Sequence, residues 1–138
     1  MVDAAIRIQS QVLGNPCTIS QAAMLAACQQ PLPDEQTRRM TAFDERRRFL
    51  IAEINQIPGL KLTAPRGAFY ALVDVRELAA KKGLDDVRIC EQLLDKHLLA
   101  AVPGSAFAIP GFVRFSYAAA MDALRAAVAR LRAFAEAK

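Results

Sequence analysis

The C-terminal part of the sequence contains one arginine that could bind an acid. Residues 102–118 read VPGSAFAIPGFVRFSYA, and Arg114 lies within a run of aromatic residues and valine that is typical of a strand. Alternation puts Val113, Phe115 and Tyr117 on one face and Phe112, Arg114 and Ser116 on the other. A guanidinium can hold a carboxylate through two parallel hydrogen bonds. A solvated edge-strand arginine is the simpler interpretation. The spacing of the residues is compatible with either role of Arg114.

A second arginine is placed unusually, at the centre of the basic run 46–48. Arg47 falls within an apolar helical stripe, so its guanidinium must reach solvent or find a partner such as a carboxylate or the carbonyls at a helix C-terminus. We expect a partnered, structural arginine. Arg46 and Arg48, like Lys81 and Lys82, are typical of a solvated helix face.

The remaining candidates for chemistry favour structural roles. His97 is the only histidine, and at a helix end its charge would complement the helix dipole. Cys17, Cys28 and Cys90 are odd in number and far apart, which argues against disulfides and a zinc site, so we expect reduced, buried thiols. The six glycines form neither a dinucleotide-binding fingerprint nor a P-loop.

The composition excludes several classes of protein. The chain has 138 residues, of which 54% are hydrophobic and 23% charged, and this indicates one globular domain. No apolar run approaches the roughly 20 residues of a membrane span, and the N-terminus does not resemble a secretory signal. The net charge of +4 comes from 18 basic residues spread among 14 acidic ones, which is a weak signal for nucleic acid. We expect a cytoplasmic protein that binds neither membranes nor nucleic acid.

The first half of the chain predicts three helices and two strands. Apolar spacing indicates a helix over 2–13 that ends at Gly14. A second helix should run to about Gln30, with Asn15 as its cap, or begin later through a capping box from Thr18 to Gln21. A long helix is expected over 35–56 behind Asp34, with an apolar stripe of Met40, Phe43, Leu50, Ile51, Ile54 and Ile57. The segments 60–63 and 67–75 predict an antiparallel pair of strands.

The second half continues with short helices and strands. Residues 76–83 indicate a short helix or turn, and 85–97 a helix capped by Asp85 or Asp86. We expect the inward residues of that helix to be Val87, Cys90, Leu93 and Leu94. Strands are predicted at 98–102 and 112–117, followed by a helix with Met121, Leu124, Val128, Leu131 and Ala135 on one face.

This order of elements predicts an α+β fold. We expect a small two-layer domain in which helices cover one face of a short, mainly antiparallel sheet. The first helix begins without a convincing cap ahead of Val2, which leads us to expect further sequence upstream.

Three segments in this order resemble a known family. QSQVLGNPCTISQAA (9–23), PRGAFYALVDV (65–75) and VPGSAFAIPGFVRFSYA (102–118) are similar to the C-terminal region of fold-type I aminotransferases of the aspartate aminotransferase family, which depend on pyridoxal 5′-phosphate (PLP). ERRRFLIAEINQIPG (45–59) fits the long helix before the GAFY strand. The resemblance covers nearly the whole chain.

The resemblance implies roles for particular residues. The arginine of the V-R-[LF]-S strand holds the substrate α-carboxylate in this family, and here it is Arg114. The P-G-x-x-F turn beside the cleft corresponds to Pro103, Gly104 and Phe107. Ala108 stands where members commonly have glycine. Leu13 and Gly14 precede Asn15, where the family often offers hydroxyl side chains to the cofactor phosphate of a partner subunit.

The resemblance also implies that the catalytic parts of the enzyme lie elsewhere. The family needs a lysine that binds PLP and an aspartate that pairs with its pyridine nitrogen, both in the large domain. None of the lysines 61, 81, 82, 96 and 138 has the S-x-S-K type of context. We expect residues 1–138 to be the small domain, with residues 1–30 as its linking helical segment and the large PLP-binding domain absent.

These expectations lead to two hypotheses of different classes. In the first, the chain is the small-domain portion of an aminotransferase that moves an amino group between an amino acid and a 2-oxo acid. That enzyme is a homodimer when complete, and the chain alone is inactive and binds no cofactor. In the second, it is a free-standing noncatalytic interaction module that uses its basic helix on an anionic partner.

Overall fold

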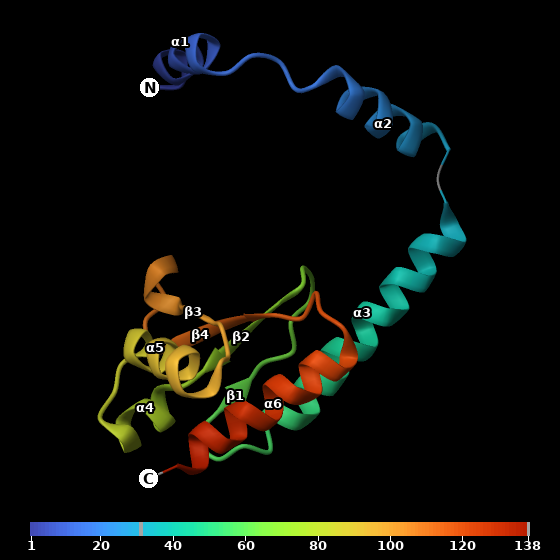
Figure 1. Cartoon of the computed structure of the whole chain (residues 1–138). Coiled ribbons are helices and arrows are strands. Elements are labelled where there is room, and N and C mark those ends of the chain that lie inside the picture. The colour runs from blue at the N-terminus through green and yellow to red at the C-terminus, as the bar shows by residue number, and fades with distance from the viewer. Residues whose placement is uncertain (31, 138) are drawn as a thin grey trace. The chain divides into compact units, whose positions relative to one another are not determined.

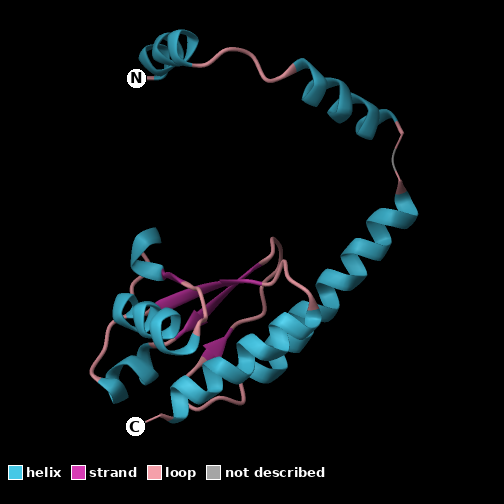
Figure 2. Cartoon of the chain, viewed as in Figure 1, coloured by secondary structure: helices cyan, strands magenta, loops and turns pink. Residues whose placement is uncertain are grey.

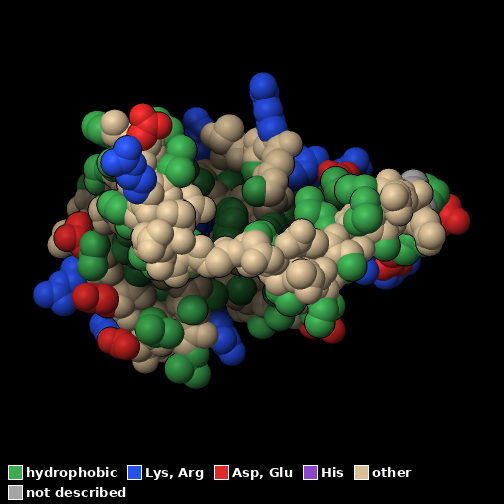
Figure 3. Space-filling view, turned by 90° about the horizontal axis from the view of Figure 1, so that it is seen from above, with side chains coloured by type: hydrophobic (Ala, Val, Ile, Leu, Met, Phe, Trp, Pro, Cys, Tyr) green, Lys and Arg blue, Asp and Glu red, His purple; other side chains and the backbone are tan. Residues whose placement is uncertain are grey.

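The computed structural model describes residues 1–30 and 32–137. The chain divides into two units, Met1–Thr37 and Arg38–Lys138. The first unit contains helix α1 (Val2–Val12), helix α2 (Thr18–Gln29) and the start of α3 (Pro33–Ile54) (Figures 1 and 2). No residue of 1–30 is buried, and hydrophobic side chains lie open along this segment (Figure 3). The large exposed ones in this range are Met1, Val2, Ile6, Ile8, Val12, Leu13, Ile19, Met24 and Leu25.

The second unit contains a four-stranded antiparallel sheet with strand order β1-β2-β4-β3. The strands are β1 (Lys61–Leu62), β2 (Tyr70–Asp74), β3 (Val102–Pro103) and β4 (Phe112–Ser116). The helices are α4 (Arg76–Lys82), α5 (Asp86–His97), the 3₁₀ helix η1 (Gly104–Phe107) and α6 (Met121–Glu136), besides most of α3 (Figure 1). The predicted α+β class and the antiparallel pairing of the first two strands are confirmed.

The core lies on one face of the sheet. Ala71, Val73 and Val113 point to this face and are completely buried, whereas Tyr70 and Leu72 on the opposite face are 37% and 36% exposed. Helices α3 and α6 run side by side (Figure 1), with an Arg132–Glu53 ion pair of 3.2 Å between them. Their buried side chains are Leu50, Ile54, Leu124, Val128, Leu131, Phe134 and Ala135. The predicted apolar stripes are thus confirmed, except that Met40 is 67% exposed.

The start of α2 differs from the first of the two predicted alternatives. The helix begins at Thr18 with Cys17 at the cap position, so the expectation that Asn15 caps it is wrong. The Asn15 side chain donates instead to the Pro16 carbonyl at 3.0 Å. The later start is correct, but Gln21 also donates to Pro16 O, at 2.7 Å, so no capping box forms.

Helix α5 is capped as expected but presents a different face. Asp85 is the cap, and its side chain accepts a hydrogen bond from Arg88 N at 2.7 Å. Ile89, Cys90 and Leu93 are buried, so the prediction holds for the last two. Val87 and Leu94, which were expected inside, are 40% and 52% exposed.

The strand expected at 98–102 is mostly absent. Leu98 closes α5 in a left-handed conformation with φ 51°, and only Val102 and Pro103 pair with β4. A left-handed residue turns the chain sharply after a helix, which delays the strand.

The cysteine prediction is partly wrong. All three thiols are free, but only Cys90 is buried, because no core forms around Cys17 and Cys28 in the segment 1–30. Hydrogen bonds from the backbone N–H groups of Ser20 and then Ile19 hold the pKa of Cys17 below its usual value. Among the described residues, no helix is both long and apolar enough to cross a membrane.

Candidate carboxylate-binding site

Arg114 projects from the middle of the sheet, on the face opposite the core. Its neighbours across the strands are Leu72 on β2 and Val102 on β3. Val113 beside it is completely buried, so alternation directs Arg114 to the other face, as predicted. Because β4 pairs on both sides, Arg114 is not an edge-strand residue, and the simpler interpretation is wrong on this point. An interior strand gives the guanidinium a firmly hydrogen-bonded base.

Two aromatic rings hold the guanidinium of Arg114. Its Cζ atom lies 4.5 Å from the ring centroid of Tyr70 and 4.2 Å from that of Phe107. Each such contact at a partly exposed site stabilises by about 0.5–1 kcal/mol. No hydrogen bond or ion pair joins the Arg114 side chain to another residue in the ranges 1–30 and 32–137. The N–H donors of the side chain therefore stay available for an anion.

The turn that carries Phe107 is closely packed. A Cβ atom on Gly104 would collide with Ile109 O and lie 2.8 Å from Phe112 O, so only glycine fits there. Ala108 adopts a left-handed conformation with φ 57°, and Ile109 N donates to Gly104 O at 3.0 Å. The turn therefore uses at Ala108 the backbone conformation that glycine adopts most easily. Pro103 is the cap residue of η1, and Gly104 and Phe107 are its first and last residues. That this turn lies beside a substrate cleft stays a prediction.

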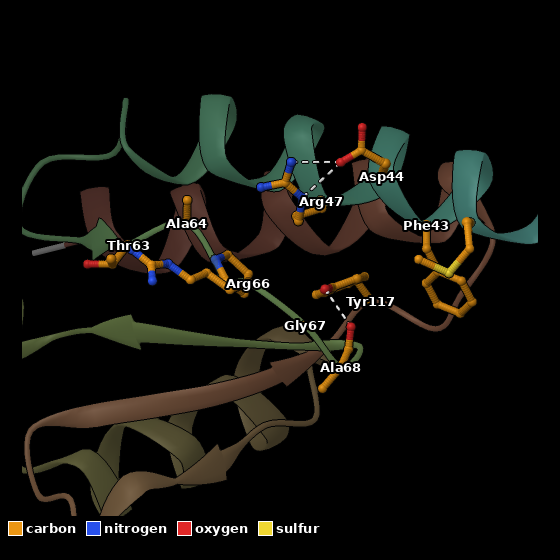
Figure 4. A pocket seen from close by; sticks show the side chains of 11 residues that line it. Phe43, Asp44, Arg47, Thr63, Ala64, Arg66, Gly67, Ala68 and Tyr117 are labelled. Atoms are coloured by element: carbon orange, nitrogen blue, oxygen red, sulfur yellow. Dashed lines mark hydrogen bonds and ion pairs between the residues drawn. The ribbon is translucent and has the colours of Figure 1, made fainter.

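Arg47 has a different environment. A surface hollow of about 590 Å³ lies between α3 and the loop 63–68, and Arg47 lines it together with Phe43 and Tyr117 (Figure 4). Arg47 Nε and Nη2 both donate to Asp44 Oδ1, at 2.9 and 2.7 Å. The expectation that Arg47 has a structural partner is confirmed. Tyr117 closes the hollow by donating to Ala68 O at 2.8 Å.

The other basic residues of α3 are also engaged. Arg48 pairs with the second oxygen of Asp44 at 2.7 Å and is 76% exposed, as expected for a solvated face. The Arg46 guanidinium lies 5.2 Å from the centroid of Phe43. The hydrogen bond from Arg47, opposed by desolvation and aided by the charge of Arg48, keeps the pKa of Asp44 below its usual value. One carboxylate thus contacts two of the three arginines in the run.

The described lysines all lie on elements other than β4, which carries Arg114. Lys61 is on edge strand β1, which β2 separates from β4. Lys82 Nζ donates to Ala137 O at 2.6 Å, and Lys96 approaches the Gln92 side chain at 3.4 Å. Lys81 is exposed on α4; Lys138, the fifth lysine of the sequence, lies outside the described residues. The described residues contain no cluster of three or more potential metal ligands.

His97 is placed as a structural residue. It ends α5, as predicted, and its ring meets that of Phe134 edge to face with centroids 5.6 Å apart. Sequence reasoning missed Tyr70 as a partner of Arg114. The register of β2 against β4, which pairs Tyr70 with Ser116, is the signal that could have found it.

Comparison with known proteins gives a consistent result. The sequence profile of the family described as aminotransferase class I and II matches residues 1–131. The aspartate aminotransferase of Geobacillus stearothermophilus is 39% identical over 140 residues, which cover 100% of this chain and 35% of that protein. The aspartate/prephenate aminotransferase of Nitrosomonas europaea is 38% identical and covers 95% of this chain and 34% of its own length.

Solved structures agree in fold. The aspartate aminotransferase of Rhizobium meliloti matches 98% of this chain and 35% of its own, with a TM-score of 0.83 and 33% identity. The Thermus thermophilus aspartate aminotransferase with maleate matches 96% of this chain and 34% of its own, with a TM-score of 0.75 and 36% identity. The chain spans about a third of the length of the relatives it matches. It belongs to the aminotransferase class I and II family.

Proposed function

We propose that this chain is the small-domain portion of a PLP-dependent aminotransferase, in which Arg114 binds the α-carboxylate of the substrate. The substrates would be an amino acid and a 2-oxo acid, with aspartate as the first donor to test, because the relatives are named for it. Residues 1–30 would link this domain to a large PLP-binding domain, and the complete enzyme would be a homodimer. The lysine that binds PLP would lie outside the chain, which alone would be inactive.

The observation that carries the proposal is the state of Arg114. An arginine without an ionic partner, held between the rings of Tyr70 and Phe107 on the open face of the sheet, is ready to form a bidentate bond with a planar anion. Ring contacts occupy the faces of a guanidinium and leave its N–H edges free. An α-carboxylate has the shape and charge that such an edge recognises. PLP, when bound in the complete enzyme, would act as the electron sink for the amino carbon.

The interaction-module alternative finds less support. It needs an unpaired basic helix, whereas Arg47 and Arg48 both contact Asp44. The arginine that lies between two aromatic rings is instead on the sheet. Such surroundings favour a small organic acid over a polyanion.

The test is carboxylate binding by the 138-residue chain itself. Maleate is titrated at constant ionic strength while NMR follows the backbone amide signals of β4 in every variant and, in the wild type, the Nε–H signal of Arg114, which is assigned by its absence in Arg114→Lys. That variant keeps the positive charge but lacks the two parallel N–H donors of the guanidinium, so we expect it to bind maleate about tenfold more weakly. Arg47→Lys is the matched control and should bind as the wild type does. Equal affinity of the wild type and Arg114→Lys would refute the role of Arg114.

A second measurement tests the location of the PLP lysine. The chain is incubated with PLP, reduced with borohydride and mapped by mass spectrometry. We expect only scattered, low-level labelling of exposed lysines and no transamination of aspartate. Stoichiometric labelling of one lysine together with turnover would place the catalytic lysine inside this chain and overturn that part of the proposal.

A further inference from the structure

A buried carboxylate lies behind the turn that carries Phe107. Asp86 is 5% exposed and is the one buried charged residue among those that the structure describes. It is the first residue of α5, yet the neighbouring Asp85 already caps that helix. Asp86 Oδ2 accepts instead a hydrogen bond from Ser105 N at 2.7 Å, nineteen residues along the chain. Asp86 therefore serves the turn rather than its own helix.

The surroundings of Asp86 are hydrogen-bond donors and not a cation. Burial by itself raises the pKa of Asp86, but hydrogen bonds from the Ser105 N–H and hydroxyl and from further backbone N–H groups, Gly111 included, outweigh it and leave the pKa lowered. No ion pair involves Asp86 within the described ranges. A buried charge in such a place is stable only while its donors stay in position. The carboxylate and the turn therefore hold each other.

The same turn determines where the Phe107 ring lies. Phe107 is the last residue of η1, and the helix begins one residue before Ser105. Its side chain is 44% exposed, so burial in the core does not fix the ring. The ring nevertheless lies 4.2 Å from the Cζ atom of Arg114. Its position depends on the hydrogen bonds of the turn, of which the bond from Ser105 to Asp86 is the one that ties η1 to α5.

We propose that Asp86 is a positioning residue for Arg114. Its carboxylate fixes the 104–111 turn so that Phe107 closes over the guanidinium and keeps the N–H edge directed at the substrate carboxylate. The inference rests on the proposed function of Arg114, which it deepens by naming what preorganises the arginine. Nothing in the mechanism requires Asp86 to touch the substrate.

The test compares Asp86→Ala with Asp85→Ala in the 138-residue chain. Both changes remove one carboxylate from the same end of α5, but only the first removes the contact to Ser105. We expect Asp86→Ala to move the Arg114 Nε–H signal toward that of a solvated arginine, because the ring current of Phe107 is lost. Maleate affinity should fall about two- to tenfold, as for the loss of one preorganised side chain. Asp85→Ala should lower the melting temperature through the lost cap but leave both readouts unchanged.

If Asp86→Ala does not fold, Asp86→Asn serves as the test of whether Asp86 positions Arg114. The amide keeps one acceptor oxygen and the shape of the carboxylate, so we expect a smaller change in the same direction. An unchanged Arg114 signal and maleate affinity in a folded Asp86 variant would overturn the inference, and so would an equal effect of Asp85→Ala. If wild-type Arg114 does not respond to maleate, the proposed function fails. The Arg114 signal without ligand still reports separately whether Asp86 positions it.

Discussion

Replacing Ala108 by glycine tests the turn beside Arg114, because we expect this substitution to stabilise the protein rather than destabilise it. The φ of Ala108, 57°, lies in the left-handed region, which costs a non-glycine residue about 1–2 kcal/mol. Replacing it by glycine removes this strain, while the greater freedom of glycine in the unfolded chain offsets about 0.4–1 kcal/mol. We therefore expect Ala108→Gly to stabilise the second unit by about 0.5–1 kcal/mol, or about 2–8 °C in melting temperature.

The matched control is Ala106→Gly, two residues away. Ala106 is exposed like Ala108 but lies inside η1 with a negative φ, so it gains nothing from glycine. There the same change should destabilise by about 0.5–1 kcal/mol through lost chain entropy. The two variants are thus expected to differ in sign although their chemistry is identical.

Urea unfolding followed by tyrosine fluorescence is the suitable assay. The chain has no tryptophan and two tyrosines, Tyr70 and Tyr117, both in the second unit, so the signal reports on that unit alone. The midpoint should rise for Ala108→Gly and fall for Ala106→Gly at an unchanged slope. If both variants lose stability to the same extent, Ala108 is not strained and the description of the turn is wrong.

Three further predictions concern the core, the thiols and the pH dependence of stability. Leu93→Ala should cost about 2–5 kcal/mol because Leu93 is completely buried, whereas Leu94→Ala, at a half-exposed side chain, should cost under about 1 kcal/mol; urea midpoints compare them. Burial and then the nearby charge of Asp86 raise the pKa of Cys90 to about 11, so iodoacetamide at pH 8 should label the two exposed cysteines and reach Cys90 only in urea, as mass spectrometry would show. The hydrogen bond from Arg76 lowers the pKa of Asp74, so its contribution to stability is present above about pH 4 and is lost as the pH falls further; Arg76→Gln should flatten melting temperature against pH in this range.

Much of the fold could be predicted from periodicity. The sequence pattern is clear for the apolar stripes of α3 and α6 and for the alternation of β4, because each of these elements packs only one of its sides against the core. Helix α5 shows where this fails. It contacts the sheet, η1 and α6, so its buried stripe is Ile89, Cys90 and Leu93, and Val87 lies about 200° around the helix from Ile89. A short apolar helix allows several faces, and only its neighbours choose among them.

The candidate site divides in the same way. Arg114 could be found because a charged residue in an aromatic strand is a local pattern, whereas Phe107 was expected beside it only through the family resemblance. Tyr70 becomes visible only when the register of β2 against β4 is known. Asp86 could not be found, because its partner Ser105 is nineteen residues away and the two aspartates at 85 and 86 are equivalent as caps on paper. The local sequence indicates that Arg114 can bind an anion, whereas the residues that fix its position are determined by tertiary contacts.

The outer strands of the sheet have a consequence for how this chain can associate. Each is only two residues long, and one of them ends in Pro103, which has no amide hydrogen to offer. A strand from another molecule could therefore form very few backbone hydrogen bonds with either edge of the sheet. Concentrated solutions should therefore resist fibrillar, cross-β growth, and contacts between molecules should form through side-chain surfaces.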